Sequence, residues 1–201
     1  MDANDAGPIA EPAEAASAFE PPGGVLVWIV ILVEMATFSA ALVAFALGRR
    51  DEPAAFAAGR AALDQPLALT NTLVLLTGGY LMANAVASLR AGSTRAARRW
   101  MLAATGSGAL FMTLKAVEWA AELHRGFGLH HDTFFTYYWL LTSFHFLHVA
   151  VATVILAALQ RGVGLGRHSA SAPGDVEAGA AFWHMCDLVW LVVYPTIYLL
   201  G

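Results

Sequence analysis

Apolar residues dominate five long stretches of the chain, and charged residues gather between them. The apolar stretches cover approximately residues 23–48, 66–89, 100–123, 133–160 and 178–200. Each is long enough to cross the hydrocarbon core of a bilayer, because about 20 helical residues span about 30 Å. The pattern therefore predicts an all-α integral membrane protein, folded as a bundle of five transmembrane helices with short loops. No soluble domain fits between the helices.

The first 22 residues have a different character. They hold five acidic residues, four prolines and neither lysine nor arginine, a composition typical of segments that stay unfolded. We expect residues 1–22 to form a disordered acidic tail in the cytoplasm and residues 23–201 to form one membrane domain. A secretory signal peptide begins with basic residues, so the first apolar stretch is expected to remain as a helix of the protein.

The composition narrows the chemistry. Hydrophobic residues make up 58% of the chain and charged residues only 13%, whereas soluble domains carry about 25% charged residues. The single cysteine, Cys186, excludes an intrachain disulfide, a CxxC zinc site, a c-type haem attachment and a four-cysteine iron–sulfur cluster. It also excludes a copper centre built on two thiolates. No basic segment suggests binding to nucleic acid.

The arginines predict an orientation in the membrane. The connection between the second and third helices holds Arg90, Arg95, Arg98 and Arg99, and Arg161 and Arg167 follow the fourth helix, whereas Arg49, Arg50, Arg60 and Arg125 lie on the opposite side. Cytoplasmic loops carry an excess of positive residues. We therefore expect a multi-pass protein of the bacterial cytoplasmic membrane, with the amino terminus in the cytoplasm and the carboxyl terminus in the periplasm.

Seven ionisable side chains inside the predicted helices are the main candidates for a role: Glu34, Lys115, Glu118, His145, His148, His184 and Asp187. Such a group costs about 2.5–3.5 kcal/mol at the centre of a membrane helix, so it is expected to be buried and paired. Six of the seven form pairs spaced three residues apart, and residues at this spacing share a helix face. Each pair is therefore expected to face a neighbouring helix rather than lipid.

Three interpretations of these polar groups remain open at this point. The first is a hydrogen-bonded network that fixes the packing of the helices. The second is proton handling, with Glu34 as the most isolated carboxylate. The third is a small membrane metalloenzyme that binds metal or haem through His145, His148 and His184, although such sites usually recruit more ligands.

Four segments resemble subunit III of cytochrome c and quinol oxidases. Residues 182–191 read Phe-Trp-His-Met-Cys-Asp-Leu-Val-Trp-Leu and are similar to the family's WHxxDxxW signature. Residues 142–149 are similar to its TGxHxxHV segment. Phe146 stands where the family usually has a glycine between the two histidines. Asn71 and Thr72 open a stretch similar to NTxxLLxSG, and Glu34 stands before Met-Ala-Thr-Phe like the family's buried carboxylate. The four segments follow one another in the family's order.

The resemblance implies a non-catalytic accessory subunit with no haem or copper of its own. Such a subunit packs against the catalytic subunit I, which holds haem with copper or non-haem iron, and it supports assembly, turnover stability and proton uptake. It also implies a bound phospholipid. Glu34 would be the proton-related carboxylate, while Asn71, Thr72, Trp183 and Trp190 would be packing residues of the signature. No catalytic centre is expected in this chain.

Within the family, two segments resemble one branch. Residues 115–119 read Lys-Ala-Val-Glu-Trp, and residues 134–138 read Phe-Phe-Thr-Tyr-Tyr. Both are similar to the short members encoded beside nitric oxide reductases, the nitric oxide reductase E proteins. The resemblance therefore favours a nitric oxide reductase as the partner over a terminal oxidase.

Overall fold

The computed structural model describes residues 24–170 and 172–200, and almost all of them are helical. The elements in chain order are α1 (Val25–Asp51), α2 (Pro53–Ala62), α3 (Gln65–Arg90), α4 (Thr94–His124), α5 (Thr133–Gly164), α6 (Gly174–Tyr194) and the π-helix η2 (Pro195–Leu199). Five helices of the described residues are long and apolar enough to cross a membrane, the last being α6 continued by η2. The predicted fold class is confirmed for this part of the chain. The predicted tail, residues 1–22, lies outside the described residues.

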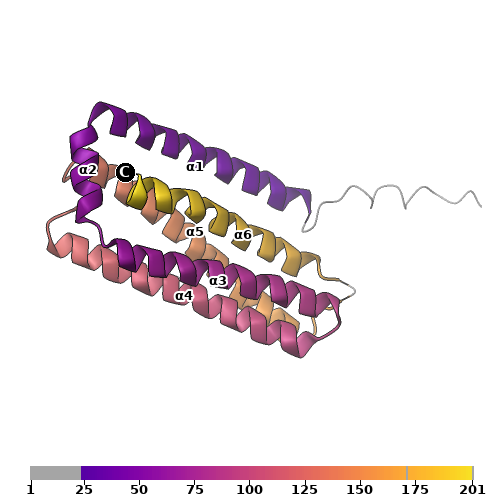
Figure 1. Ribbon diagram of the computed structural model, residues 1–201. Coiled ribbons are helices and arrows are strands. Elements are labelled where there is room, and N and C mark those ends of the chain that lie inside the picture. The colour runs from indigo at the N-terminus through magenta and orange to yellow at the C-terminus, as the bar shows by residue number, and fades with distance from the viewer. Residues whose placement is uncertain (1–23, 171, 201) are drawn as a thin grey trace, which may run out of the picture.

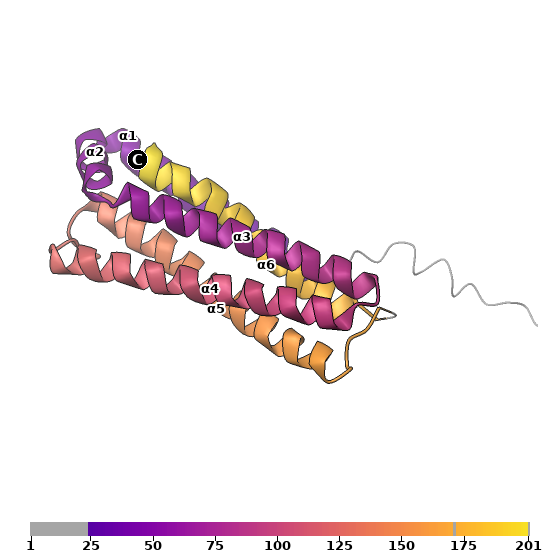
Figure 2. The same ribbon diagram turned by 60° about the horizontal axis from the view of Figure 1, so that its bottom comes forward.

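The five long helices form an elongated bundle (Figure 1). Helices α3 and α4 run side by side in opposite directions, and both views place them on the side of the bundle away from α1 (Figure 2). Helix α1 lies along the outside, where it contacts α5 and α6. In the most apolar 18-residue stretch of α1, only 6% of the residues are buried, whereas 56% are buried in the corresponding stretch of the last span. The core is therefore built from α3 to α6.

A narrow stripe of side chains attaches α1 to the bundle. Its buried residues are Phe38 and Phe45, which share a helix face with Glu34 because they lie four and eleven residues further on. Phe38 packs against Phe144 at a ring distance of 4.9 Å, and Phe45 packs against Phe56 at 5.0 Å. The other faces of α1 are apolar and exposed.

The short helix α2 was not predicted from the sequence. Pro53 begins it, as proline is tolerated at the first helical position, where its missing N–H costs nothing. Phe56 and Gly59 are its buried residues, and an added Cβ at Gly59 would collide with the Phe134 ring. The connection between α1 and α3 is thus a packed element that closes one end of the bundle.

Helix boundaries follow local chemistry. The Asp64 carboxylate accepts a hydrogen bond from Leu67 N at 2.9 Å and caps α3, and Asp132 caps α5 through Phe135 N at 2.7 Å. Helix α4 begins at Thr94, several residues before the predicted start, so Arg95 lies in its first turn. Hydropathy marks only the membrane-embedded part of a helix, and a charged first turn extends beyond it.

Small residues allow α3, α4 and α6 to approach closely. A Cβ added at Gly78 of α3 would collide with Ser107 Oγ of α4 and lie 2.8 Å from the Trp183 ring of α6. A Cβ added at Gly108 would meet the same ring at 2.8 Å. Small residues play this role in membrane bundles because they let helix backbones come together. The Trp183 indole fills the space that the two glycines leave.

We predict that Gly78→Val destabilises the bundle by about 1–3 kcal/mol, the usual cost of overpacking a filled core. Gly106→Val is the matched control, because a Cβ there meets nothing within 4 Å. Denaturation of both variants in detergent micelles would compare them. Equal stability of the two variants would contradict the close approach at Gly78.

Candidate functional site

The structure sorts the seven predicted polar groups into three clusters and one separate histidine. We name the clusters the lysine cluster (Lys115, Glu118, Tyr138 and Tyr198), the Glu34–His148 pair and the His184–Asp187 pair. In the part of the chain that the structure describes, no hydrogen bond or ion pair links one cluster to another. The polar groups therefore form separate clusters rather than one continuous hydrogen-bonded network.

The lysine cluster is a fully buried charge pair. Lys115 Nζ lies 3.0 Å from Glu118 Oε1, and the two side chains are 0% and 1% exposed. Glu118 Oε1 also accepts hydrogen bonds from the Tyr138 hydroxyl at 2.8 Å and the Tyr198 hydroxyl at 2.6 Å. Lys115 contacts the Tyr198 hydroxyl as well. One carboxylate oxygen therefore joins α4, α5 and η2.

Three aromatic rings surround the ammonium group of Lys115. Its Nζ lies 4.9 Å from the centroid of the Tyr138 ring, 5.2 Å from Tyr198 and 5.4 Å from Trp190. Aromatic faces attract a cation within about 6 Å, and they do so most strongly when water is excluded. The rings thus replace part of the hydration that Lys115 loses on burial.

The position of Tyr198 depends on the end of the last helix. Pro195 has no backbone N–H to continue the α-helical ladder, and the chain changes there from α6 to the π-helix η2. Leu200 N donates to Pro195 O at 2.8 Å, which closes the wider turn. This turn carries the Tyr198 hydroxyl to Glu118.

The Glu34–His148 pair joins α1 to α5. His148 Nε2 lies 3.1 Å from Glu34 Oε2, within ion-pair distance, although the two groups are not aligned as a hydrogen bond. The Glu34 side chain is 25% exposed and that of His148 is 10% exposed. Phe38 covers the imidazole with a ring distance of 5.4 Å. Glu34, predicted as the most isolated carboxylate, therefore has an imidazole as its neighbour.

Hydrogen-bonding rules limit how protons can be placed on this pair. His148 Nδ1 lies 2.8 Å from the Phe144 carbonyl oxygen, which can only accept, so Nδ1 carries a hydrogen. A neutral imidazole then presents a lone pair at Nε2 to Glu34, because only one ring nitrogen is protonated. An ionised Glu34 would place a second lone pair opposite it at 3.1 Å. The contact is therefore more favourable when either the carboxyl or the imidazole carries one further proton.

The His184–Asp187 pair lies where α6 meets α3. His184 Nδ1 is 3.3 Å from Asp187 Oδ2, and an added Cβ at Gly79 of α3 would collide with that same carboxylate. Nearer the end of these helices, Arg90 pairs with Glu177 at 2.8 Å. The His184 side chain is 42% exposed, so it lies on the outer surface of the bundle.

His145 has no polar partner and lies among aromatic rings. It stacks on Trp190 at a ring distance of 4.8 Å, and it is fully buried with neither ring nitrogen hydrogen-bonded to a described residue. The Trp190 indole donates to Thr72 Oγ1 of α3 at 2.9 Å. Asn71 is also buried, and its amide has no hydrogen-bond partner among the described residues. These residues pack α3, α5 and α6 together around Trp190.

The geometry does not support the metalloenzyme interpretation. His145, His148 and His184 face aromatic rings, Glu34 and Asp187 respectively. Among the described residues, no three His, Cys, Asp or Glu side chains come together in a way that could hold a metal ion. The three histidines therefore face different neighbours.

Two tyrosines of the lysine cluster were missed as site residues in the sequence. Tyr138 lies near the start of the fourth apolar stretch, and Tyr198 follows Pro195 near the end of the last one. Aromatic residues near span ends are typical interface anchors. These two tyrosines differ from interface anchors only in that their hydroxyls contact the buried Lys115 and Glu118 of α4. A sequence does not show which helices are neighbours, so it does not reveal these contacts.

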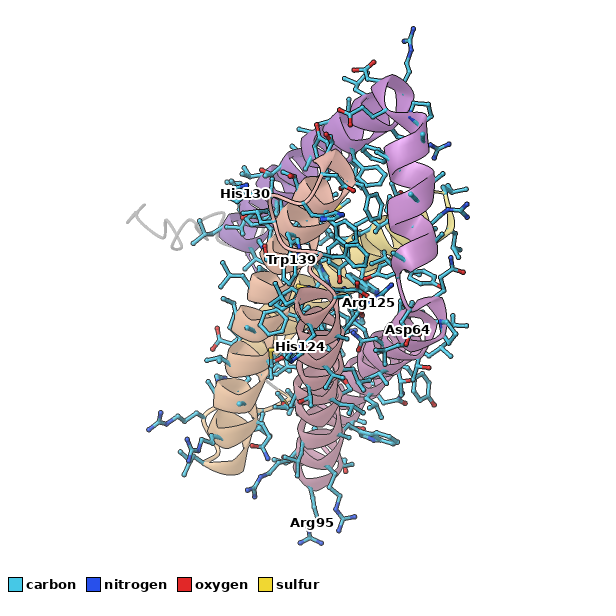
Figure 3. All side chains as sticks on the ribbon, turned by 90° about the vertical axis from the view of Figure 1, so that its left-hand side faces the viewer. Asp64, Arg95, His124, Arg125, His130 and Trp139 are labelled. Atoms are coloured by element: carbon cyan, nitrogen blue, oxygen red, sulfur yellow. The ribbon has the colours of Figure 1, made fainter. Side chains whose placement is uncertain are left out.

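At the opposite end of α4 from its first turn, charged groups connect the loops. Glu122, which is 1% exposed, pairs with Arg125 at 3.1 Å, and Arg125 donates to the Ala62 carbonyl at 2.6 Å. Figure 3 shows Arg125 and Asp64 at this end, below α2. Arg60 of α2 donates to Leu199 O at 3.2 Å. Helix α2 is therefore tied to the ends of both α4 and η2.

These features define a class of protein: a multi-pass helical membrane protein whose intramembrane charges are paired within the bundle. Residues 24–201 match the family described as cytochrome c oxidase subunit III. The match covers nearly the whole chain, and the chain belongs to this family. The resemblance of the four sequence segments to subunit III is confirmed at this level.

Curated relatives carry related names. "Cytochrome c oxidase subunit 3" of Synechocystis is 29% identical over 178 residues, which cover 88% of this chain and 74% of the relative. "Cytochrome bo(3) ubiquinol oxidase subunit 3" of Pseudomonas aeruginosa is 23% identical over 87% of this chain and 83% of the relative. "Heme-copper oxidase subunit I+III" of Aeropyrum pernix is 28% identical over 86% of this chain and 22% of that longer protein.

A charge-balanced set of variants tests the lysine cluster. We predict that Glu118→Gln and Lys115→Met each lower the free energy of unfolding by about 3–5 kcal/mol, because each leaves an uncompensated buried charge. The double variant is expected to lose less than either single variant. It contains no buried charge at these two positions, and the introduced amide oxygen still accepts from the tyrosines.

Denaturation in detergent micelles measures the four proteins of this cycle. Losses that simply add in the double variant would contradict the assignment of a coupled ion pair.

Proposed function

We propose that this chain is a non-catalytic subunit III of a haem-copper respiratory complex. It assembles with the catalytic subunit I and sustains the turnover stability and proton uptake of that subunit. The observation that carries the proposal is the family match over residues 24–201. The ion pairs Lys115–Glu118, Glu34–His148 and His184–Asp187 lie within the bundle and are consistent with it. Haem, with copper or non-haem iron, belongs to the partner subunits.

The partnership with subunit I has support from one relative. The name of the Aeropyrum protein joins subunits I and III in one polypeptide, which suits two units that work side by side. Helix α1 offers an apolar surface of the right kind, because Ile29, Leu32 and Val33 are all more than half exposed. Lipid or a neighbouring transmembrane helix covers such a surface in a membrane.

A bound phospholipid is part of the proposal. An apolar groove of about 490 Å³ runs between α1, α5 and α6, and its lining includes Val30, Ile155 and Phe182. A second groove of about 420 Å³ lies further along the junction of α1 and α5, beside Tyr137 and Phe144. Grooves lined by apolar side chains at membrane depth suit acyl chains.

The Glu34–His148 pair is the proposed proton-related element. Its geometry favours one shared proton, and its partial exposure leaves Glu34 within reach of groups outside the bundle. Intramembrane carboxylates and histidines of this kind mark proton relays in other membrane proteins. The pair would exchange that proton on behalf of the partner subunit.

Two segments favour a nitric oxide reductase as a second candidate for the partner. These are residues 115–119 and 134–138, whose sequences resemble the nitric oxide reductase E branch. In the structure they pack together, because Tyr138 donates to Glu118. The named relatives are oxidase subunits, so the choice of partner is a matter for experiment.

The orientation predicted from the arginines is part of the proposal. The start of α1, the α3–α4 turn and the end of α5 lie at one end of the bundle (Figure 1). The compact group of arginines in the second and third of these segments would face the cytoplasm. The amino terminus would then be cytoplasmic and the carboxyl terminus periplasmic.

The first experiment is a mild-detergent purification of the tagged full chain from its native membranes. We expect a larger haem-containing subunit to co-purify. Metal analysis of the eluate separates the candidates, because copper indicates an oxidase and non-haem iron without copper indicates a nitric oxide reductase. A lone chain that carries its own stoichiometric transition metal would overturn the proposal.

We predict that Glu34→Gln leaves membrane insertion intact but shortens the active lifetime of the partner complex during proton-coupled turnover. Glutamine keeps the size of the side chain but cannot exchange the proton. Asp51→Asn is the matched control, since Asp51 is an exposed carboxylate at the end of the same helix. If turnover of the Glu34 variant matches that of the control over many cycles, Glu34 has a packing role and no proton-related one.

A further inference from the structure

Four arginines gather at the end of the bundle where α4 begins and α5 ends. Arg95, Arg98 and Arg99 lie in the first two turns of α4, and Arg161 lies in the last turn of α5. Figure 3 shows Arg95 extending away from the end of the bundle. All four are exposed. They come from two segments that are far apart in the sequence, so the fold brings them together.

None of these guanidinium groups is neutralised within the described residues. The ion pairs made by arginines there involve Arg90 and Arg125, at 2.8 and 3.1 Å. Arg95, Arg98, Arg99 and Arg161 make no hydrogen bond or ion pair with any described residue. The amino-terminal end of α4 adds positive potential, because the N-terminus of a helix carries a partial positive charge.

Two adjoining hollows lie between these side chains. One, of about 210 Å³, is lined by Arg95, Arg98, Arg99, Leu102 and Gln160. The other, of about 200 Å³, is lined by Arg98, Arg161, Gly164 and Leu165. Each is many times the roughly 10–15 Å³ that one water needs, and Arg98 borders both.

Gly164 shapes the space beside Arg98. A Cβ added at Gly164 would lie 3.2 Å from Arg98 Cζ and Nε. The guanidinium therefore packs against the bare backbone at the end of α5. Guanidinium groups bind phosphate oxygens with two parallel hydrogen bonds, and several of them converge here on one space.

The surroundings favour a lipid as the source of the phosphate. Leu102 and Leu165, which line the hollows, are 59% and 68% exposed. Leu102 lies one to two turns further into the membrane span than the arginines of α4. The site thus offers positive charge at the level of the headgroups and apolar surface beside it. Basic pockets between membrane helices recognise anionic headgroups in this way.

We propose that this cleft between α4 and α5, centred on Arg98, binds the phosphate group of an anionic phospholipid. The site is separate from the apolar grooves beside α1 and does not rest on the proposed function. It predicts a lipid requirement for the free chain as well as for a complex. The excess of positive residues in cytoplasmic loops explains why arginines lie on one side of the membrane. It does not explain why they converge on one hollow.

The test uses the full-length chain, delipidated in mild detergent and followed by native mass spectrometry. Short-chain phosphatidylglycerol, short-chain phosphatidylcholine and inorganic phosphate are the three probes. We expect phosphatidylglycerol to bind at least roughly tenfold more tightly than phosphatidylcholine, because more than one arginine contributes about fivefold each. Equal binding of the two lipids would overturn the proposal. Inorganic phosphate that binds as tightly as phosphatidylglycerol would overturn the lipid as the source.

Arg98→Gln/Arg99→Gln should weaken phosphatidylglycerol binding by roughly 30-fold, since two contacts of about fivefold are lost. Arg49→Gln/Arg50→Gln is the matched control, because it removes two exposed arginines at the opposite end of the bundle. Equal losses in the two double variants would show a general charge effect and would overturn the site.

A second variant, which keeps every charge, tests the site if the double arginine variant does not insert into the membrane. Gly164→Leu fills the hollow beside Arg98 and should weaken phosphatidylglycerol binding by at least roughly fivefold, the contribution of one arginine. Gly106→Leu is its control, as a Cβ there meets nothing within 4 Å. Unchanged lipid binding in Gly164→Leu would place the lipid elsewhere and contradict the proposal.

Discussion

Lys115 and Glu118 form an ion pair in the interior of the bundle, where neither side chain reaches lipid or water. Two charges in this position are costly unless every remaining hydrogen-bonding site finds a partner. The tyrosine hydroxyls from α5 and η2 donate to Glu118 Oε1 and aromatic rings surround Nζ, whereas Glu118 Oε2 has no hydrogen-bond partner among the described residues. The positions of α4, α5 and the last span therefore depend on one another through a single carboxylate oxygen. An apolar contact would hold the helices together, but it would not fix their rotation and depth so closely.

Helix α1 is attached in a different way. It contributes the buried Phe38 and Phe45 and the contact of Glu34 with His148, and two apolar grooves lie along its junction with α5. The polar contact is also the one whose geometry favours a shared proton. A helix held by a narrow stripe presents most of its surface to its surroundings, which suits a subunit that works against a larger partner. The buried Lys115–Glu118 pair and the proposed proton-related pair thus lie in separate parts of the bundle.

The two ends of the bundle differ in how their charges are satisfied. At the α2 end, Arg60 and Arg125 donate to backbone carbonyls, and Glu122 pairs with Arg125. At the other end, Arg90 pairs with Glu177, but the arginines of the first turns of α4 have no partner in the described residues. Paired charges tie α2 to the neighbouring helices at the first end, where Arg49 and Arg50 remain exposed. Unpaired guanidinium groups leave the second end suited to an external anion.

The sequence by itself determined the membrane class, the five spans and the family, because long apolar runs and spaced signature residues are local properties of a chain. It also indicated that the intramembrane charges would be paired, since lipid penalises unpaired ones. It did not show α2, whose short apolar sequence resembles an ordinary loop. Pairs within one helix, such as Lys115 with Glu118, followed from spacing alone.

Partners on different helices required the tertiary structure. Glu34 with His148, Glu118 with Tyr198, and Arg98 with Gly164 join residues that are far apart in the chain. His145 and His148 share a spacing pattern, yet one faces Trp190 and the other faces Glu34. Helix periodicity shows which residues share a face, but the rotation and neighbours of each helix are set by packing across the whole bundle. For that reason, only the fold decided where these side chains meet.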